Sequence, residues 1–274
     1  MSFVPPWQKE KTKRSMDMNE TWKTAITKIE PNKIVVRGYK LDQLMGKLSY
    51  PQTIFLLIKG EIPTKNGGKM LDAILVSSVD HGVTPPSCQA AVTVASTGAP
   101  LNAALASGIL AINEFHGGAI EQSMNTLEAG VSLVRNEKIT VTDAARQVVK
   151  ESLEKKKKIM GYGHRIHTND PRTVKLFTLA QEYGISGKYI EMSKSIQNAF
   201  LEETGKKLPI NVDGAIAAVL CEISIPAELA NFFFITARLP GLLAHIYEEK
   251  TRYKPMRRID FTQAEYDGPE ERNI

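Results

Sequence analysis

From Gly38 onward, the sequence is a series of segments with helical periodicity, separated by short loops that carry Gly, Pro, Asn and Asp. Apolar residues recur in these segments at the spacing of an α-helical turn, which favours helices over strands. With 42% hydrophobic residues and no internal repeat, the chain can form a core, and the pattern predicts an all-α fold. The expected helices cover residues 53–58, 69–79, 86–95, 101–115, 120–135, 141–157, 172–183, 188–203, 212–222, 226–238 and 239–249.

The exception to the helical pattern lies near the N-terminus. Two short β-branched runs, Ala25 to Glu30 and Lys33 to Arg37, flank the turn dipeptide Pro31-Asn32 and predict a β-hairpin. The first 20 residues are polar, charged and poorly periodic, so we expect them to form an arm.

Composition limits the class of protein. The two cysteines, Cys88 and Cys221, are too few for a disulfide framework and lack the spacing of a zinc site. The longest apolar stretches, such as Ala215 to Cys221, are shorter than the roughly 18–20 residues that cross a bilayer. No export signal is visible at the N-terminus. These features predict a cytoplasmic protein without membrane association.

The net charge of +5 is a modest surplus that could belong to ordinary solvated surfaces or could attract a polyanion. No aromatic RNA-binding motif, zinc-finger spacing or basic region with heptads accompanies it. An anionic small molecule is therefore a better candidate ligand than nucleic acid.

Three of the five histidines, His81, His116 and His164, lie next to glycines in predicted loops. Glycine lets a ligand approach the backbone closely, although each of these histidines could equally be a packed residue. Asp213 opens an apolar helix, where a carboxylate either complements the helix dipole or acts chemically. HExxH, GxSxG and GxxxxGK[ST] are all missing from the sequence, which excludes the common zinc-protease, serine-hydrolase and P-loop sites.

Three motifs occur in a recognisable order: His116-Gly117-Gly118-Ala119, then Gly161-Tyr162-Gly163-His164-Arg165 followed by Asp170-Pro171-Arg172, then Asn211-Val212-Asp213. Supporting segments are Arg37 to Asp42, Gly60 to Thr64 and Tyr266 to Arg272. Together they resemble the citrate synthase family over most of the chain from Ile26 onward. The short spacing between Thr64 and His81, with Asp80 to Ser87, resembles the citrate-cleaving branch: citryl-CoA lyase and the C-terminal portion of ATP-citrate lyase.

The resemblance implies a citrate synthase-like fold with two domains. We expect a large helical domain at 1–115 and 221–274, a smaller one at 116–220, and closure of one on the other to exclude water from the site. The family shares residues across a subunit interface, so the resemblance also implies a homodimer or a higher homo-oligomer.

The resemblance also implies the catalytic residues. Asp213 is expected to be the acid/base at the acetyl methyl group, His116 to donate a hydrogen bond to the thioester oxygen, and His164 to handle the proton on the keto or hydroxyl oxygen. It implies no metal and no permanently bound cofactor, because the CoA thioester is itself the substrate or product.

Substrate-binding residues follow from the same resemblance. The expected contacts to the oxaloacetate-derived part are His81, Arg172, Arg238 and the apolar wall Phe234, with Arg257 or Arg258 reaching the site of the partner subunit. Arg238 has an alternative reading as a helix C-terminal charge. The expected CoA contacts are Met160, Gly161, Tyr162 and Gly163 for the adenine, and Lys206 and Lys207 for the phosphates.

These residues fit three functions. The first is a citryl-CoA lyase that yields acetyl-CoA and oxaloacetate, with a separate ligase as a possible source of citryl-CoA. The second is a short citrate synthase, although Ile120 replaces the Asn that many synthases have after His-Gly-Gly-Ala. The third is a non-catalytic, CoA-binding regulatory subunit, against which the presence of His116, His164 and Asp213 argues.

Overall fold

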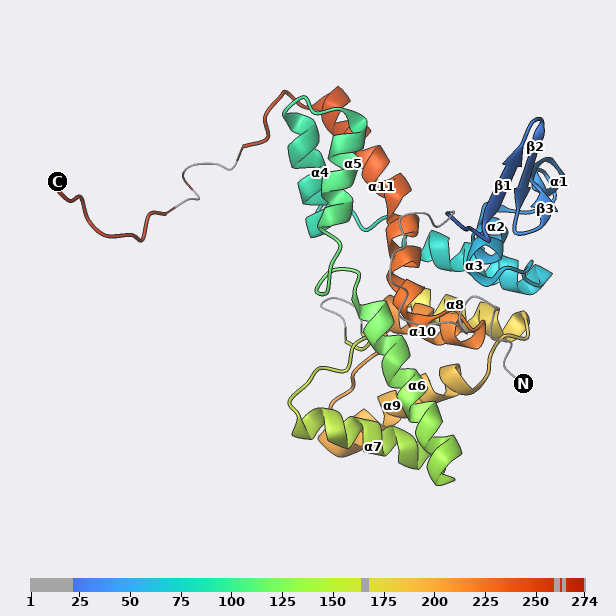
Figure 1. Ribbon diagram of the computed structural model, residues 1–274. Helices are drawn as coiled ribbons and strands as arrows, with labels where there is room; N and C mark the ends of the chain where they lie inside the picture. The colour runs from blue at the N-terminus through green and yellow to red at the C-terminus, as the bar shows by residue number, and fades with distance from the viewer. Residues whose placement is uncertain (1–21, 164–167, 259–261, 263–264, 274) are drawn as a thin grey trace. The chain divides into compact units, whose positions relative to one another are not determined.

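The computed structural model describes residues 22–163, 168–258, 262 and 265–273. Within these residues the chain is mainly helical, with a small antiparallel sheet at its beginning (Figure 1). The predicted all-α class with a short N-terminal hairpin is therefore confirmed.

The sheet consists of β1 (Thr27–Glu30), β2 (Lys33–Val36) and β3 (Tyr39–Lys40), in the order β1-β2-β3. Glu30 pairs with Lys33 across the predicted turn, and Asn32 adopts a positive φ of 59°. Asparagine tolerates this conformation better than most residues, which explains why the turn forms here. The sequence did not predict β3.

The described residues pack as two compact units. The first unit comprises the described chain up to Ser77 together with Ala119–Phe233, and the second comprises Ser78–Gly118 with the described chain from Phe234 onward. These bounds differ from the predicted domains because α3 packs against α8, which groups the N-terminal elements with the central helices. The predicted domain division stays a prediction.

The first unit is built around α10 (Val212–Glu222), which packs against three other helices and is buried from Gly214 to Cys221. Glu222 closes this helix with one carboxylate oxygen that accepts hydrogen bonds from three backbone amides at the start of α9, at 2.9–3.0 Å. The other helices of the unit are α1 (Leu41–Leu44), α2 (Tyr50–Lys59), α3 (Lys65–Ser77), α6 (Ala119–Glu137), α7 (Val141–Glu154), α8 (Pro171–Glu182), α9 (Lys188–Thr204) and the 3-10 turn η2 (Ala227–Leu229).

The second unit contains α4 (Pro86–Ser96), α5 (Leu101–Leu110) and most of α11 (Ala230–Arg252), which begins in the first unit. These three helices lie side by side in Figure 1. Leu242 and Ile246 of α11 are buried in one core cluster with residues of α4 and α5.

Several predicted helix boundaries differ from the observed ones by a few residues, and α1 was not predicted. Two of the differences concern the segments around His116 and Arg238. The helix expected at 101–115 ends at Leu110, because the Asn113 side chain donates to the Leu110 carbonyl at 2.6 Å and a tight turn follows. The helices expected at 226–238 and 239–249 are joined in α11, which contains Pro240. Proline removes one backbone donor, but the burial of Leu242 and Ile246 beyond it stabilises continuation of the helix.

The helical run Ala227–Arg252 has 26 residues and meets the length and composition of a membrane span, with a mean hydropathy of 1.3 in its most apolar window. Of that window, 44% is buried inside the protein. A core helix of a soluble protein meets the same criterion, so the finding is weak evidence for a membrane span. The prediction of no membrane association stays a prediction.

Candidate active site

His116 lies in a tight turn that follows α5. The backbone N–H groups of Asn113 and His116 each donate to the other residue's carbonyl at 2.9 Å, and Gly118 N–H donates to the Asn113 carbonyl at 3.0 Å. Three backbone hydrogen bonds within six residues fix the direction in which the imidazole leaves the chain.

The His116 ring is held by a serine from a different helix. Ser87, at the start of α4 and fully buried, places its Oγ 2.8 Å from His116 Nε2. Burial lowers the pKa of His116, and the positive charges of Arg238 and His81 lower it further. These causes favour a neutral imidazole, which has one N–H donor and one acceptor nitrogen.

Phe234 and Arg238, both on α11, complete the surroundings of His116. The Phe234 ring meets the imidazole edge-on at 5.6 Å between centroids, and the Arg238 guanidinium lies 4.9 Å from the centre of the Phe234 ring. Arg238 is buried and its Nε donates to the Ser78 carbonyl at 3.0 Å. Because α11 continues to Arg252, the alternative reading of Arg238 as a helix C-terminal charge is wrong.

Gly117 is required by this packing. Its φ is +87°, and a Cβ atom there would lie 2.6 Å from Ile112 Cγ2 and 2.7 Å from Phe234 Cδ1. The glycine after His116 thus lets the turn approach α11 closely. The expectation that the glycine lets a ligand approach the backbone stays a prediction.

In the first unit, Asp213 stands in the first turn of α10, half-buried. Asn211 is the N-cap of this helix, and its Oδ1 accepts a hydrogen bond from Gly214 N–H at 3.1 Å. Asparagine is among the preferred N-cap residues because it satisfies a backbone donor of the first turn. The helix start that presents Asp213 is therefore fixed by its own sequence.

The predicted CoA-binding loop, Met160 to Gly163, pairs with the segment before α10. Tyr162 and Ile210 form an antiparallel bridge, flanked by hydrogen bonds from Asn211 N–H to the Gly161 carbonyl (3.0 Å) and from Gly163 N–H to the Pro209 carbonyl (2.7 Å). The Tyr162 hydroxyl donates to the Ser193 carbonyl at 3.0 Å, and burial raises the pKa of this phenol. Tyr162 therefore anchors the loop.

Two glycines bring this loop into direct contact with α10. A Cβ atom on Gly214 would lie 2.2 Å from the Gly161 carbonyl oxygen. A Cβ atom on Gly161 would lie 2.5 Å from Ser123 Oγ and 2.7 Å from Gly214 Cα. Because most of these neighbours are backbone atoms, neither position has room for a side chain.

Arg172 is the second residue of α8 and forms an ion pair with Asp170, which is almost fully buried. Its Nε and Nη2 donate to the two carboxylate oxygens at 3.0 and 2.8 Å. The next residue, Thr173, donates from Oγ1 to the Ile210 carbonyl at 3.1 Å. These contacts connect the start of α8, which carries Arg172, to the Ile210 segment that pairs with the loop and leads into α10.

The structure shows least about three of the predicted site residues, Lys206, Lys207 and His164. Lys206 and Lys207 are exposed and follow Gly205, the C-cap of α9. His164 lies outside the described residues. His116 and Asp213 belong to different units, so their convergence on one cleft stays a prediction.

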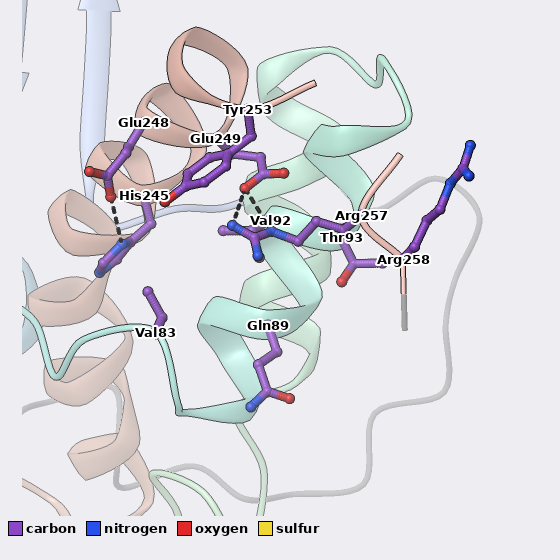
Figure 2. A pocket seen from close by; sticks show the side chains of 10 residues that line it. All are labelled: Val83, Gln89, Val92, Thr93, His245, Glu248, Glu249, Tyr253, Arg257 and Arg258. Carbon is purple, nitrogen blue, oxygen red and sulfur yellow. Dashed lines mark hydrogen bonds and ion pairs between the residues drawn. The ribbon is translucent and has the colours of Figure 1, made fainter. Parts of the chain in front are cut away.

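The two candidate interface arginines differ in their contacts. Both line a cavity of about 700 Å³ in the second unit, together with Glu249 and Tyr253 (Figure 2). Arg257 donates from Nε to Glu249 Oε2 at 2.7 Å and lies over the Tyr253 ring. Arg258 points away from Glu249 in Figure 2 and has no ion pair among the described residues. Which of the two arginines reaches a partner subunit stays a prediction.

The sequence profile described as "Citrate synthase, C-terminal domain" matches residues 65–259, which is more than half of the chain. The chain belongs to the citrate synthase family. The matched region contains His116, Asp213 and Arg238, so the motif-based resemblance is confirmed at the level of the family.

Two groups of known proteins are similar to this family member. Citrate synthase 2 from Bacillus subtilis is 31% identical over 79% of this chain and 55% of its own length, and a putative citrate synthase 2 from Mycobacterium tuberculosis is 33% identical over 73% and 51%. The chain thus spans about half the length of the curated relatives that it matches.

Solved structures give a second group. A citryl-CoA lyase from Hydrogenobacter thermophilus is 43% identical, with a TM-score of 0.86 over 93% of this chain and 98% of that chain. An ATP citrate lyase from Methanothrix soehngenii, solved with citrate and coenzyme A, has a TM-score of 0.81 over 99% of this chain and 47% of that chain. At 21% identity the latter shows the fold alone.

In this citrate synthase family protein, the second unit brings together His116, Phe234 and Arg238, and the charge of His81 acts on His116. The first unit brings the predicted CoA-binding loop to the helix start with Asp213 and to the start of α8 with Arg172. Sequence reasoning missed Ser87 as the partner of His116. It identified Asn211 only as part of the motif Asn211-Val212-Asp213. A residue that acts through a side-chain hydrogen bond to a distant segment leaves no periodic signal in one sequence.

Proposed function

We propose that the protein is a citryl-CoA lyase that cleaves citryl-CoA to acetyl-CoA and oxaloacetate. The similarity to the Hydrogenobacter citryl-CoA lyase supports this reading, because it extends over nearly the whole of both chains at 43% identity. The match to curated citrate synthases covers only about half of each of those proteins.

Three events in the reaction need a catalytic group: removal of the hydroxyl proton, stabilisation of the enolate oxygen and protonation of the enolate carbon. A base removes the proton from the citryl hydroxyl, and the carbon–carbon bond breaks to leave the keto group of oxaloacetate. The electron pair of that bond passes to the acetyl fragment as a thioester enolate, which then takes a proton at its methyl carbon. We assign the hydroxyl proton to His164, the enolate oxygen to His116 and the methyl proton to Asp213.

The hydrogen bond between Ser87 and His116 is the observation that carries the role of His116. When Ser87 donates its hydroxyl proton to Nε2, the neutral imidazole holds its own proton on Nδ1. That N–H is the donor that a developing enolate oxygen requires. Loss of one such preorganised donor typically costs about 10²–10³ in rate, so His116→Ala is expected to lose activity by that amount.

The charged residues suit the rest of the substrate. Arg238 is a buried cation beside His116, and Arg172 is oriented by a carboxylate that engages only its Nε and Nη2. Guanidinium groups bind carboxylates through two parallel hydrogen bonds, which matches the carboxylates of the oxaloacetate-derived part. We assign CoA to the Met160–Gly163 loop with Lys206 and Lys207.

A short citrate synthase is the second candidate, favoured by the curated relatives named citrate synthases at 31–33% identity. The two activities differ in hydrolysis of the thioester. Purified protein is given citryl-CoA and oxaloacetate formation is followed, and in a parallel assay it is given acetyl-CoA and oxaloacetate and free thiol is followed. Rapid cleavage with negligible thiol release supports the lyase, and catalytic thiol release contradicts it.

Binding of CoA without either reaction supports the third reading, a non-catalytic CoA-binding subunit. We further propose that the protein works in the cytoplasm as a homodimer or higher homo-oligomer. A lyase does not make its own substrate, so a separate ligase is expected to supply citryl-CoA. Light scattering of the purified protein at several concentrations tests the oligomeric state.

A further inference from the structure

The segment Pro209 to Asn211 is a junction in the first unit. Asn211 N–H donates to the Gly161 carbonyl and Gly163 N–H donates to the Pro209 carbonyl, so hydrogen bonds join the segment to the CoA-binding loop on both sides of Tyr162. The Ile210 carbonyl accepts a hydrogen bond from the Thr173 hydroxyl. The segment then enters α10 at Asn211. The loop, the start of α8 and the helix with Asp213 therefore share one short piece of backbone.

The side chain of Asn211 joins two of these parts directly. Its Oδ1 accepts from Gly214 N–H at 3.1 Å, and its Nδ2 donates to the Gly163 carbonyl at 2.9 Å. A planar amide has a fixed distance between these two atoms. The Asn211 side chain therefore fixes the distance between the Gly163 carbonyl and the first turn of α10.

We propose that Asn211 is a positioning residue that fixes the CoA-binding loop against the helix turn carrying Asp213. This inference rests on the proposed function, in which the loop binds CoA and Asp213 acts on the acetyl group of the same molecule. The distance between the bound thioester and the carboxyl group then depends on one side-chain amide.

An N-cap alone does not require an amide here. Serine and aspartate cap helices about as well as asparagine, because each offers an oxygen to the backbone donor. Only a side chain with both an acceptor and a donor at the end of a two-carbon stem makes both contacts. Helix capping therefore does not explain the hydrogen bond from Asn211 Nδ2 to the Gly163 carbonyl.

The test separates the two contacts. Asn211→Ser keeps an oxygen for the cap, but its side chain ends one atom earlier and cannot reach the Gly163 carbonyl. Asn211→Asp keeps the cap and replaces the donor with a carboxylate oxygen. As a matched control, Thr140→Ala removes the N-cap of α7, where Thr140 Oγ1 accepts from Asp143 N–H, without touching the loop.

Three measurements are made on each full-length variant: the melting temperature, the dissociation constant for CoA by calorimetry, and kcat for citryl-CoA cleavage. Amide hydrogen exchange of the peptide containing Gly161 to Gly163 is followed as well. We expect Asn211→Ser to melt near the wild type, exchange faster in the loop, bind CoA more weakly and lose about 10²-fold in kcat, the scale of a 1 Å misplacement. Thr140→Ala is expected to lower the melting temperature with kcat and loop exchange unchanged.

Wild-type kcat, CoA affinity and loop exchange in Asn211→Ser would overturn the inference. If that variant does not fold, the same readouts on Asn211→Asp decide. If the wild type cleaves no citryl-CoA, the proposed function fails. The inference is then judged by loop exchange and CoA affinity, which need no turnover.

Discussion

Replacement of Ser87 by alanine isolates the contribution of one hydroxyl to the chemistry of His116. The Ser87 Oγ lies 2.8 Å from Nε2, and Ser87 itself is fully buried, so water cannot simply replace the lost group. The substitution keeps the imidazole, the turn that holds it and the contact to Phe234. What it removes is the hydroxyl that, in the proposed mechanism, donates to Nε2 and so leaves the imidazole proton on Nδ1.

The size of the effect follows from the strength of that hydrogen bond. A neutral hydrogen bond contributes about 0.5–1.5 kcal/mol net, and each 1.36 kcal/mol in the activation free energy is a factor of ten in rate. Ser87→Ala is therefore expected to lower kcat by about 10-fold at most. His116→Ala, which removes the donor itself, is expected to lower it by about 10²–10³.

The assay is the initial rate of oxaloacetate formation from citryl-CoA, measured with the melting temperature of each variant. Ser107→Ala is the matched control, because Ser107 donates to carbonyls of α5 and α4 in the same unit without contacting His116. A kcat for Ser87→Ala equal to that of the wild type, or as low as that of His116→Ala, would refute the tautomer argument.

Three further predictions concern stability. Gly117→Ala places a side chain at positive φ, at about 1–2 kcal/mol, and against Ile112 and Phe234, at about 1–3 kcal/mol more, so urea denaturation should show a loss of about 2–5 kcal/mol; an unchanged midpoint would contradict the packing described. Because the pKa of His116 is lowered on folding, the unfolded chain binds more protons than the folded chain between that lowered pKa and the ordinary value of 6.5. The free energy of unfolding should fall as the pH drops from 6.5 toward the lower pKa of the folded state, and His116→Gln should flatten this decline; an equally steep decline in the variant would show that other groups cause it. Glu222→Ala leaves three amides without their shared acceptor and should cost about 1.5–3 kcal/mol in the same urea assay, whereas a loss below about 0.5 kcal/mol would mean that water replaces the carboxylate.

Local sequence rules predicted the parts of the fold that depend on local interactions. The Pro31-Asn32 dipeptide gave the hairpin because the turn conformation is a property of those residues themselves. The same rules failed at Pro240, which they treat as a helix break. Burial of residues on the far side of the proline, a tertiary effect, keeps α11 continuous.

The candidate site shows the same limit. The glycines around His116 and the carboxylate at the start of α10 are visible as local patterns, and the family motifs add roles to them. Ser87 is 29 residues from His116 along the chain, and Asn211 is 48 residues from Gly163. Side-chain contacts over such separations depend on how helices pack, which a single sequence does not encode as a pattern.

The interlock of Gly161 with Gly214 limits how this protein can be altered in the laboratory. Trimming a neighbouring side chain cannot make room at Gly214, because the atom in the way is a main-chain oxygen that every residue possesses. A saturation library at that position should therefore return glycine alone among folded clones. A search for second-site suppressors of a Gly214 substitution should find none, unless the suppressor shifts the backbone segment that contains Gly161.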